Sequence, residues 1–454
     1  MPCPRLLMPN RLPTSGFFTK NTGYFAALAL TLLAACSHDK KARQPSDTTA
    51  AAPAAATPTQ PKLSQLNVFV DMSGGMQGFV HPVAAGATGS GFQQTVTELL
   101  SAVNAQKSAQ PAYYFFKEST PADARLLVPS TYAAMRSTVS GGLKNAARGS
   151  ELPQMLSEAL KLQAQKPGTV SVLISDFIFA PKDKGQTWDV KTFIKDALNE
   201  VEPAKLAVSV FANTSDYRGN FYPGNRTGPQ KLNGEQVPYY IWVLGDPALV
   251  AQADAGLLRK LAGQPQAHYN VDFAPPYAVL DYLDPTGSWM VPDPATPTTA
   301  PRIVFTKKPT PGQPAEAVVG LNLTSLPPSQ ASQASLKTLR LAAPDAAPAT
   351  LVRVWLLAQE PAARAQPALT KYTHFARLRL TGAPATRAAL RLEMTRPATA
   401  WIASYSTNSD SNLKAQGAKT FHLREVLAGV DEYFANEPSA QRLFSLPVEV
   451  ETRR

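Results

Sequence analysis

Cysteine is nearly absent from this sequence: it has two, Cys3 and Cys36, and both lie close to the N-terminus. No disulfide can therefore form within residues 37–454, which excludes a disulfide-stapled secreted scaffold. The stability of the fold must come from hydrophobic cores, and 44% of the residues are hydrophobic. At 454 residues, the chain has room for two domains and connecting segments.

The residues and motifs that carry most enzymatic chemistry are also scarce. The five histidines include no His-x-His and no His-x-x-x-His pair. The sequence contains no Gly-x-Ser-x-Gly motif and no phosphate-binding P-loop. We therefore expect no enzyme, and we assign no catalytic residues.

Basic residues are in excess, but they are not clustered. The formal net charge is +11, and no run of Lys and Arg with interleaved aromatic residues is present. This pattern is typical of a solvated basic surface, with attraction to an acidic partner or to anionic lipid as the alternative. A nucleic-acid partner is not expected.

Residues 1–35 have the features of a secretory signal peptide. A basic leader without acidic residues precedes an apolar stretch at residues 24–35, which is too short to span a membrane as a helix of ~20 residues. Residues 33–36 read Leu-Ala-Ala-Cys, which resembles the signal of bacterial lipoproteins. The resemblance implies cleavage before Cys36, lipid attachment to its sulfur and a membrane-anchored lipoprotein of the bacterial cell envelope. An ordinary signal peptide or a short membrane anchor is the alternative, and the sequence does not give the leaflet.

Composition divides the rest of the chain into four segments. Residues 36–63 are rich in Ala, Pro and Thr and bury too little apolar surface to fold, so we expect a flexible tether. Residues 64–285 are expected to form an α/β domain, and residues 286–301 a Pro-rich linker. Residues 302–454 are expected to form a β-rich domain.

Apolar runs alternate with amphipathic helical patterns in the first of these domains. The pattern predicts a doubly wound, mostly parallel sheet with helices on both faces. The strands are expected at residues 67–71, 112–116, 125–128, 170–174, 206–211 and 239–244, and the helices at 92–105, after 150, at 188–201 and at 248–261. Residues 212–238 interrupt this rhythm and are expected to be a long loop, and loops of this length are often functional.

Short segments separated by turn residues follow the linker. A period of two in residues 373–381 indicates a strand, and seven such segments suggest a β-sandwich-like domain. They lie at residues 302–305, 317–323, 336–341, 351–357, 373–380, 388–394 and 400–404. We further expect one helix at residues 420–434 and a final strand at 443–450.

The stretch at residues 66–79 organises the first domain. A buried apolar strand ends on Asp71, Ser73, Gly74 and Gly75. Ligands of open α/β sheets bind at the carboxyl ends of the strands. Oxygen donors at such an edge favour a hard cation such as Mg²⁺.

Asp71-Met72-Ser73-Gly74-Gly75 resembles the Asp-x-Ser-x-Ser motif that opens the metal site of a von Willebrand factor A (vWA) domain, with Gly75 in place of the last Ser. Two further loops of that family have counterparts here. Ser150 stands where the family has a Thr before a helix, and Asp176 stands where it has an Asp at the end of the fourth strand. The resemblance covers residues 66–274, under half of the chain.

The resemblance implies a metal-ion-dependent adhesion site that is partly degenerate. Ser73 and Ser150 would bind Mg²⁺ or Mn²⁺ directly, while Asp71 and Asp176 would bind it through water. Gly75 removes one hydroxyl, whose place water can take. The alternative is a site without metal, in which both aspartates only cap strand ends and accept hydrogen bonds from nearby backbone amides.

The predicted loop at residues 212–238 should lie beside this site. It contains residue types enriched at protein interfaces, which we assign as the partner-binding residues: Tyr217, Arg218, Phe221, Tyr222 and Arg226. The alternative is a loop whose aromatic residues only cover the end of the sheet.

These patterns favour an envelope-anchored lipoprotein that mediates protein–protein recognition or scaffolding through a vWA-like domain. One alternative is a metal-free structural module of an envelope complex, in which the β-rich domain makes the main contact. A more distant one is a hydrolase that uses Asp71, although the second Asp of an aspartyl-phosphate hydrolase is missing.

Overall fold

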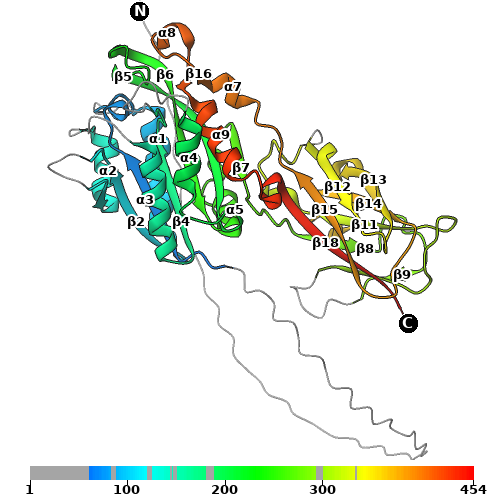
Figure 1. The fold of residues 1–454 in the computed structure, drawn as a ribbon. Coiled ribbons are helices and arrows are strands. Elements are labelled where there is room, and N and C mark those ends of the chain that lie inside the picture. Colours follow the sequence, from blue (N-terminus) through cyan, green and yellow to red (C-terminus); the bar gives the residue numbers. More distant parts are fainter. Residues whose placement is uncertain are drawn as a thin grey trace, which may run out of the picture. The chain divides into compact units, whose positions relative to one another are not determined.

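The structure, a computed structural model, describes residues 61–82, 88–119, 125–143, 146, 151–179, 189–292, 300–332 and 335–453 (Figure 1). All of them belong to one compact unit, Thr57–Arg454. The predicted signal peptide, Cys36 and nearly all of the predicted tether lie outside the described residues. In the part of the chain that is described, no helix is both long and apolar enough to cross a membrane.

Strands and helices alternate in the first part of the chain. The strands are β1 (Gln65–Asp71), β2 (Gln110–Phe116), β3 (Leu127–Ser130), β4 (Thr169–Ser175), β5 (Ala207–Phe221), β6 (Gln230–Gly245) and β7 (Gln266–Tyr269). The helices are α1 (Gly91–Asn104), α2 (Tyr132–Gly141), α3 (Leu152–Gln165), α4 (Val190–Leu198) and α5 (Pro247–Ala255). Helix α2 and strand β7 were not expected from the sequence.

The seven strands form one mixed sheet in the order β3-β2-β1-β4-β6-β5-β7. Strand β1 pairs in parallel with β2 and with β4, whereas all other neighbours in this sheet are antiparallel. Only two of the six neighbouring pairs are parallel, so the prediction of a mostly parallel sheet is wrong. One reason is the direct return of the chain from β5 to β6, because a hairpin joins antiparallel strands and a parallel pair needs a longer crossover. Strands β3 and β7 add two further antiparallel pairs at the edges of the sheet.

Helices cover both faces of this sheet, as predicted. Strand β1 shows how: Val68 and Val70 belong to one hydrophobic cluster, which contains the buried residues of α1, α2 and α5. Phe69, on the other face of the same strand, belongs to a second cluster with those of α3 and α4. Successive side chains of the strand point to opposite faces of the sheet, so one strand contributes to two hydrophobic cores.

Two larger sheets follow, besides a short two-stranded one at residues 406–407 and 420–421. Five strands form one in the order β12-β15-β18-β10-β9, and four form the other in the order β13-β14-β11-β8. Their bounds are β8 (Tyr277–Leu280), β9 (Trp289–Met290), β10 (Arg302–Phe305), β11 (Ala315–Leu321), β12 (Leu339–Ala342), β13 (Ala349–Leu356), β14 (His374–Leu380), β15 (Ala388–Thr395) and β18 (Arg442–Thr452). Alternate residues of β14 and β15 share one hydrophobic cluster, as in two sheets packed face to face.

The segment between β15 and β18 departs from the predicted strands. Residues 400–404, expected as a strand, are helical, because the segment leaves the sheets and turns toward α9. The elements here are α7 (Trp401–Tyr405), β16 (Ser406–Thr407), α8 (Leu413–Gln416), β17 (Thr420–Phe421) and α9 (Leu423–Tyr433), and the short helix α6 (Pro361–Arg364) precedes β14.

Helix α9 packs on the seven-stranded sheet although it lies within residues 302–454 (Figure 1). Val426 and Val430 belong to the same hydrophobic cluster as Ile194 of α4. A β-carbon at Gly429 would lie 2.6 Å from the carbonyl oxygen of Lys191, so glycine allows the two helices to approach closely. The C-terminal part of the chain therefore contributes to the core of the α/β part.

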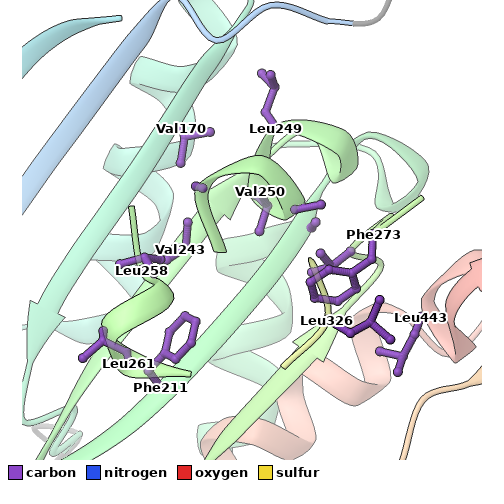
Figure 2. Packing of buried hydrophobic residues seen from close by; sticks show 14 of the residues in the cluster. Val170, Phe211, Val243, Leu249, Val250, Leu258, Leu261, Phe273, Leu326 and Leu443 are labelled. Carbon is purple, nitrogen blue, oxygen red and sulfur yellow. The ribbon is translucent and has the colours of Figure 1, made fainter. Parts of the chain in front are cut away.

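A second contact runs through the interior. Phe273, Leu326 and Leu443 lie together in Figure 2, and they belong to the same hydrophobic cluster as Leu249 and Val250 of α5. This cluster continues into the two β-sheets of residues 277–452. The predicted division near residue 290 is thus crossed by buried apolar contacts.

Limited proteolysis tests the predicted linker, of which residues 293–299 lie outside the described residues. We expect cleavage within residues 290–301, because Pro-rich connecting segments are common sites of nicking. Because α9 packs on α4, the two fragments should coelute in gel filtration and separate only in denaturant. Fragments that separate without denaturant would contradict the shared core, and resistance of the segment to cleavage would contradict the linker.

Candidate functional site

Two carboxylates meet at one edge of the seven-stranded sheet. Strands β1 and β4 are parallel neighbours, with Val70 opposite Ile174, so both end at the same edge. Asp71 is the last residue of β1, and Asp176 directly follows Ser175, the last residue of β4. Two apolar strands in register thus bring together two aspartates that are far apart in the sequence.

The chain itself supplies hydrogen bonds to Asp71, which is fully buried. The backbone N–H of Ser73 donates to Oδ1 over 2.7 Å, and the hydroxyl of Ser175 donates to Oδ2 over 2.7 Å. Both oxygens of this buried carboxylate are thus held by donors from the chain itself.

The surroundings of Asp176 disfavour its negative charge. It is 4% exposed, and its Oδ1 accepts one hydrogen bond from the N–H of Ile178 over 3.1 Å. Burial, followed by the charge of Asp71, raises the pKa of the Asp176 carboxyl to about 7. A cation between the two carboxylates, or a proton on Asp176, would relieve this repulsion.

The turn after β1 packs directly on Asp176. A β-carbon at Gly75 would lie 2.5 Å from Asp176 Oδ2 and 3.6 Å from Ser73 Oγ. Glycine is therefore required for this close approach, and a serine at position 75 would push Asp176 aside. Gly75 departs from the family motif for a steric reason that the sequence alone did not give.

The structure brings three of the four predicted ligands together: Asp71, Ser73 and Asp176. Ser150, the fourth, lies outside the described residues. The described residues contain no group of three or more His, Cys, Asp or Glu side chains that could hold a metal ion. The predicted set has two carboxylates, and its other donors are hydroxyls.

The prediction of a long loop at residues 212–238 is wrong. Strand β5 continues to residue 221 and β6 begins at residue 230, so these residues form a hairpin. Tyr217 and Phe221 are buried, with 0% and 1% of their surfaces exposed. Both side chains belong to the hydrophobic core, whereas Arg218, Tyr222 and Arg226 are exposed. Of the five predicted partner-binding residues, three therefore lie at the surface.

Tyr217 connects the hairpin to the candidate site. Its hydroxyl lies 2.9 Å from the carbonyl oxygen of Gly75 and donates to it, with the carbonyl of Asn220 at the same distance as the alternative acceptor. Its ring packs edge-on against Phe79, with 5.0 Å between the centroids. Burial, and then the charge of Asp176, raises the pKa of the Tyr217 hydroxyl, so it stays a donor.

A segment near the C-terminus, residues 406–421, holds the tip of this hairpin; we call it the C-terminal strap. Asp410 is fully buried, and its carboxylate accepts the N–H groups of Gly224 (2.5 Å) and Asn225 (3.2 Å). The side chain of Gln230 donates to the Asp410 carbonyl over 2.6 Å and accepts from the N–H of Leu413 over 3.0 Å. The strap and the tip thus form one hydrogen-bonded unit.

The strap also reaches the candidate site. Thr420 accepts the hydroxyl of Tyr240 over 2.9 Å, and the charge of Asp410 contributes to the raised pKa of Asp176. Sequence reasoning missed the strap, and also Ser175, because no local pattern ties residue 410 to a hairpin almost two hundred positions earlier. The only sequence signal is a run of Ser, Thr, Asn and Asp at residues 406–412, which is typical of turns.

No protein-family model matches the chain, and no curated protein matches it either. The resemblance to vWA domains therefore stays a prediction that rests on the motif residues.

Proposed function

We propose that this chain is an envelope-anchored recognition or scaffolding lipoprotein whose vWA-like site binds Mg²⁺ or Mn²⁺. The observation that supports the proposal is the convergence of Asp71, Ser73 and Asp176 at the ends of β1 and β4. Three positions chosen from the sequence for one purpose lie at one edge of the sheet. A hard cation suits this set, because all of its donors are oxygens.

The proposed ligands would have different roles in binding the cation. Ser73 offers a hydroxyl, while Asp71 and Asp176 offer the negative charge that a divalent cation neutralises. A bound cation would also supply a position for a carboxylate from a partner protein. The exposed side chains at the hairpin tip, Tyr222 and Arg226, would contact that partner beside the site.

The second candidate function is a metal-free structural module, and one observation favours it. Both aspartates already accept hydrogen bonds from the chain, Asp71 from Ser73 and Ser175 and Asp176 from Ile178. Carboxylates that only cap the ends of strands would accept hydrogen bonds of this kind. In this case the exposed hairpin tip and the β-rich part would make the contacts with an envelope complex, without a cation.

A metal titration separates the two functions. We expect Mg²⁺ and Mn²⁺ to raise the melting temperature of the wild type by mass action, since only the folded chain assembles the ligands. Asp71→Ala should abolish this shift. Gly75→Ser should weaken it, because its β-carbon would displace Asp176. Differential scanning fluorimetry with Ca²⁺ and Na⁺ as controls measures this, and a wild type without any shift supports the metal-free function.

Lipid attachment is tested separately. We expect Cys36→Ser to stop metabolic labelling with palmitate and to move the protein from the membrane to the soluble fraction, because a thiol is needed for the thioether bond. Cys3→Ser, in the same leader, is the matched control and should leave labelling unchanged. A labelled, membrane-bound Cys36→Ser protein would contradict the lipoprotein proposal.

A further inference from the structure

The four-stranded sheet β13-β14-β11-β8 has an outer face, turned away from the five-stranded sheet, that is covered only at one end. There, Phe375 shares a hydrophobic cluster with Ala363 and Leu369, which belong to the segment between β13 and β14. Arg377 and Arg379 follow Phe375 on the same face of β14, because alternate residues of a strand share a face. The side chain of Arg379 is 49% exposed, so this end of the face is open to solvent.

Two cations lie directly opposite each other on this open end. Arg353 of the edge strand β13 pairs with Arg377 of β14 in the antiparallel ladder. The Cζ atoms of Arg353 and Arg377 lie 4.9 Å and 5.8 Å from the centroid of the Trp355 ring. The ring holds both guanidinium groups in place, but it does not neutralise their charge. Like charges in such cross-strand positions repel each other, and a bound anion would remove the repulsion. We call Arg353, Arg377 and Arg379 the arginine face.

The chain itself shows which chemical group this face binds. The carboxylate of Glu316, on β11, lies 3.5 Å from Nη1 of Arg377 and 2.8 Å from Nη2 of Arg379. Among the described residues, no other carboxylate forms an ion pair with the arginine face, and this includes Asp281 and Asp284 in the loop after β8. Three positive charges thus meet one negative charge. Guanidinium groups bind carboxylates well, because their planar fork of N–H donors matches the two carboxylate oxygens.

Apolar side chains adjoin the arginine face. Val352, next to Arg353 at the irregularity in β13, is 44% exposed. Tyr282, also 44% exposed, precedes Leu283, whose carbonyl accepts a hydrogen bond from Nη2 of Arg377 over 2.7 Å. Exposed aromatic and arginine side chains are typical of protein-binding surfaces.

From these observations we propose that the arginine face binds an acidic segment of a partner protein, whose carboxylates bind the guanidinium groups as Glu316 does. Charge complementarity favours such a segment, because residues 351–380 contain five Arg and Lys and only one acidic residue. Apolar residues of the segment would contact Val352 and Tyr282. The arginine face lies on a different sheet from the proposed cation site, so this binding requires no cation and goes beyond both candidate functions.

Fluorescence anisotropy with a labelled peptide of eight glutamates tests this proposal. The protein is residues 37–454, which contain the whole compact unit Thr57–Arg454, in EDTA and about 50 mM NaCl. We expect the peptide to bind, and Arg353→Glu to weaken its binding by about tenfold or more, because attraction becomes repulsion. Arg424→Glu, at an exposed position on α9, changes the net charge equally and is the matched control. It should change the binding by less than about twofold.

Three outcomes would overturn the proposal. The first is a glutamate peptide that binds no better than a peptide of eight glutamines. The second is an equal loss of binding in Arg353→Glu and Arg424→Glu, since the net charge alone would then explain the attraction. The third is tighter binding of phosphatidylglycerol vesicles than of the peptide, lost in Arg353→Glu, because the face would then bind lipid. Since EDTA is present throughout, all of these outcomes are independent of the proposed cation site.

Discussion

Asp176→Asn is expected to stabilise the cation-free protein at pH 8, by up to the order of 4 kcal/mol. The physical reason is the raised pKa of Asp176, about 7, which burial and the charge of Asp71 cause. The folded chain then holds a proton that the unfolded chain releases near pH 4. The stability of the wild type is therefore greatest below pH 4, as far as this group is concerned, and falls as the pH rises to about 7. An asparagine has no charge to bury and lacks this loss.

Urea unfolding in EDTA between pH 4.5 and 8.5 measures the effect. The wild type should lose stability with rising pH more steeply than Asp176→Asn, and the two curves should run parallel above pH 7.5. Asp196→Asn, at an exposed position on α4, is the matched control and should follow the wild type. A variant that is less stable than the wild type at pH 8 would contradict the buried repulsion between Asp71 and Asp176.

Magnesium connects this result to the proposed function. If a cation neutralises both carboxylates, Mg²⁺ should restore the stability of the wild type at pH 8 and leave Asp176→Asn unchanged. If Mg²⁺ changes neither protein, Asp176 is a strand-end carboxyl that takes up a proton instead. The same variant thus distinguishes the two candidate functions.

The part of the candidate site that the sequence predicts lies on β1 and β4. Each strand is an apolar run that stops at an aspartate, and this local pattern, with the parallel order of an α/β sheet, suffices to place Asp71 beside Asp176. The role of Gly75 could not be predicted, because it depends on the distance to Asp176 Oδ2 across two strands. The C-terminal strap could not be predicted either, since the bonds of Asp410 join segments without any shared pattern.

The sequence of the β5–β6 hairpin contains the alternating pattern of a strand, although turn residues obscure it. Ser215 and Tyr217 are buried, and they alternate with the more exposed Thr214, Asp216 and Arg218, which is the period of a strand. Gly219 and the glycines and prolines that follow obscured it, and a register shift between Tyr217 and Arg218 interrupts the ladder. The antiparallel order of β4, β6 and β5 depends on this hairpin, so the error about the loop also produced part of the error about a mostly parallel sheet. The antiparallel edge strands β3 and β7 account for the rest.

Tyr217→Ala is expected to lower the free energy of unfolding by about 3–5 kcal/mol. The ring is fully buried between Phe79, Phe221 and the backbone at Gly78, so its removal leaves a cavity as well as lost contacts. Tyr217→Phe keeps the ring and removes the hydroxyl that Gly75 accepts, which should cost about 1–2 kcal/mol.

Tyr222→Ala, five positions further along the same hairpin, is the matched control. Tyr222 is 47% exposed, so its truncation should change stability by no more than about 0.5 kcal/mol. Chemical denaturation of the three variants measures this, and a Tyr217→Ala protein as stable as Tyr222→Ala would mean that the hairpin does not pack as described. The metal titration adds a measurement that would not change if Tyr217 had only a structural role. Since Tyr217 holds the carbonyl of Gly75, and Gly75 packs on Asp176, Tyr217→Phe should reduce the Mg²⁺-dependent shift, whereas Tyr222→Ala should leave it intact and impair only the capture of a partner.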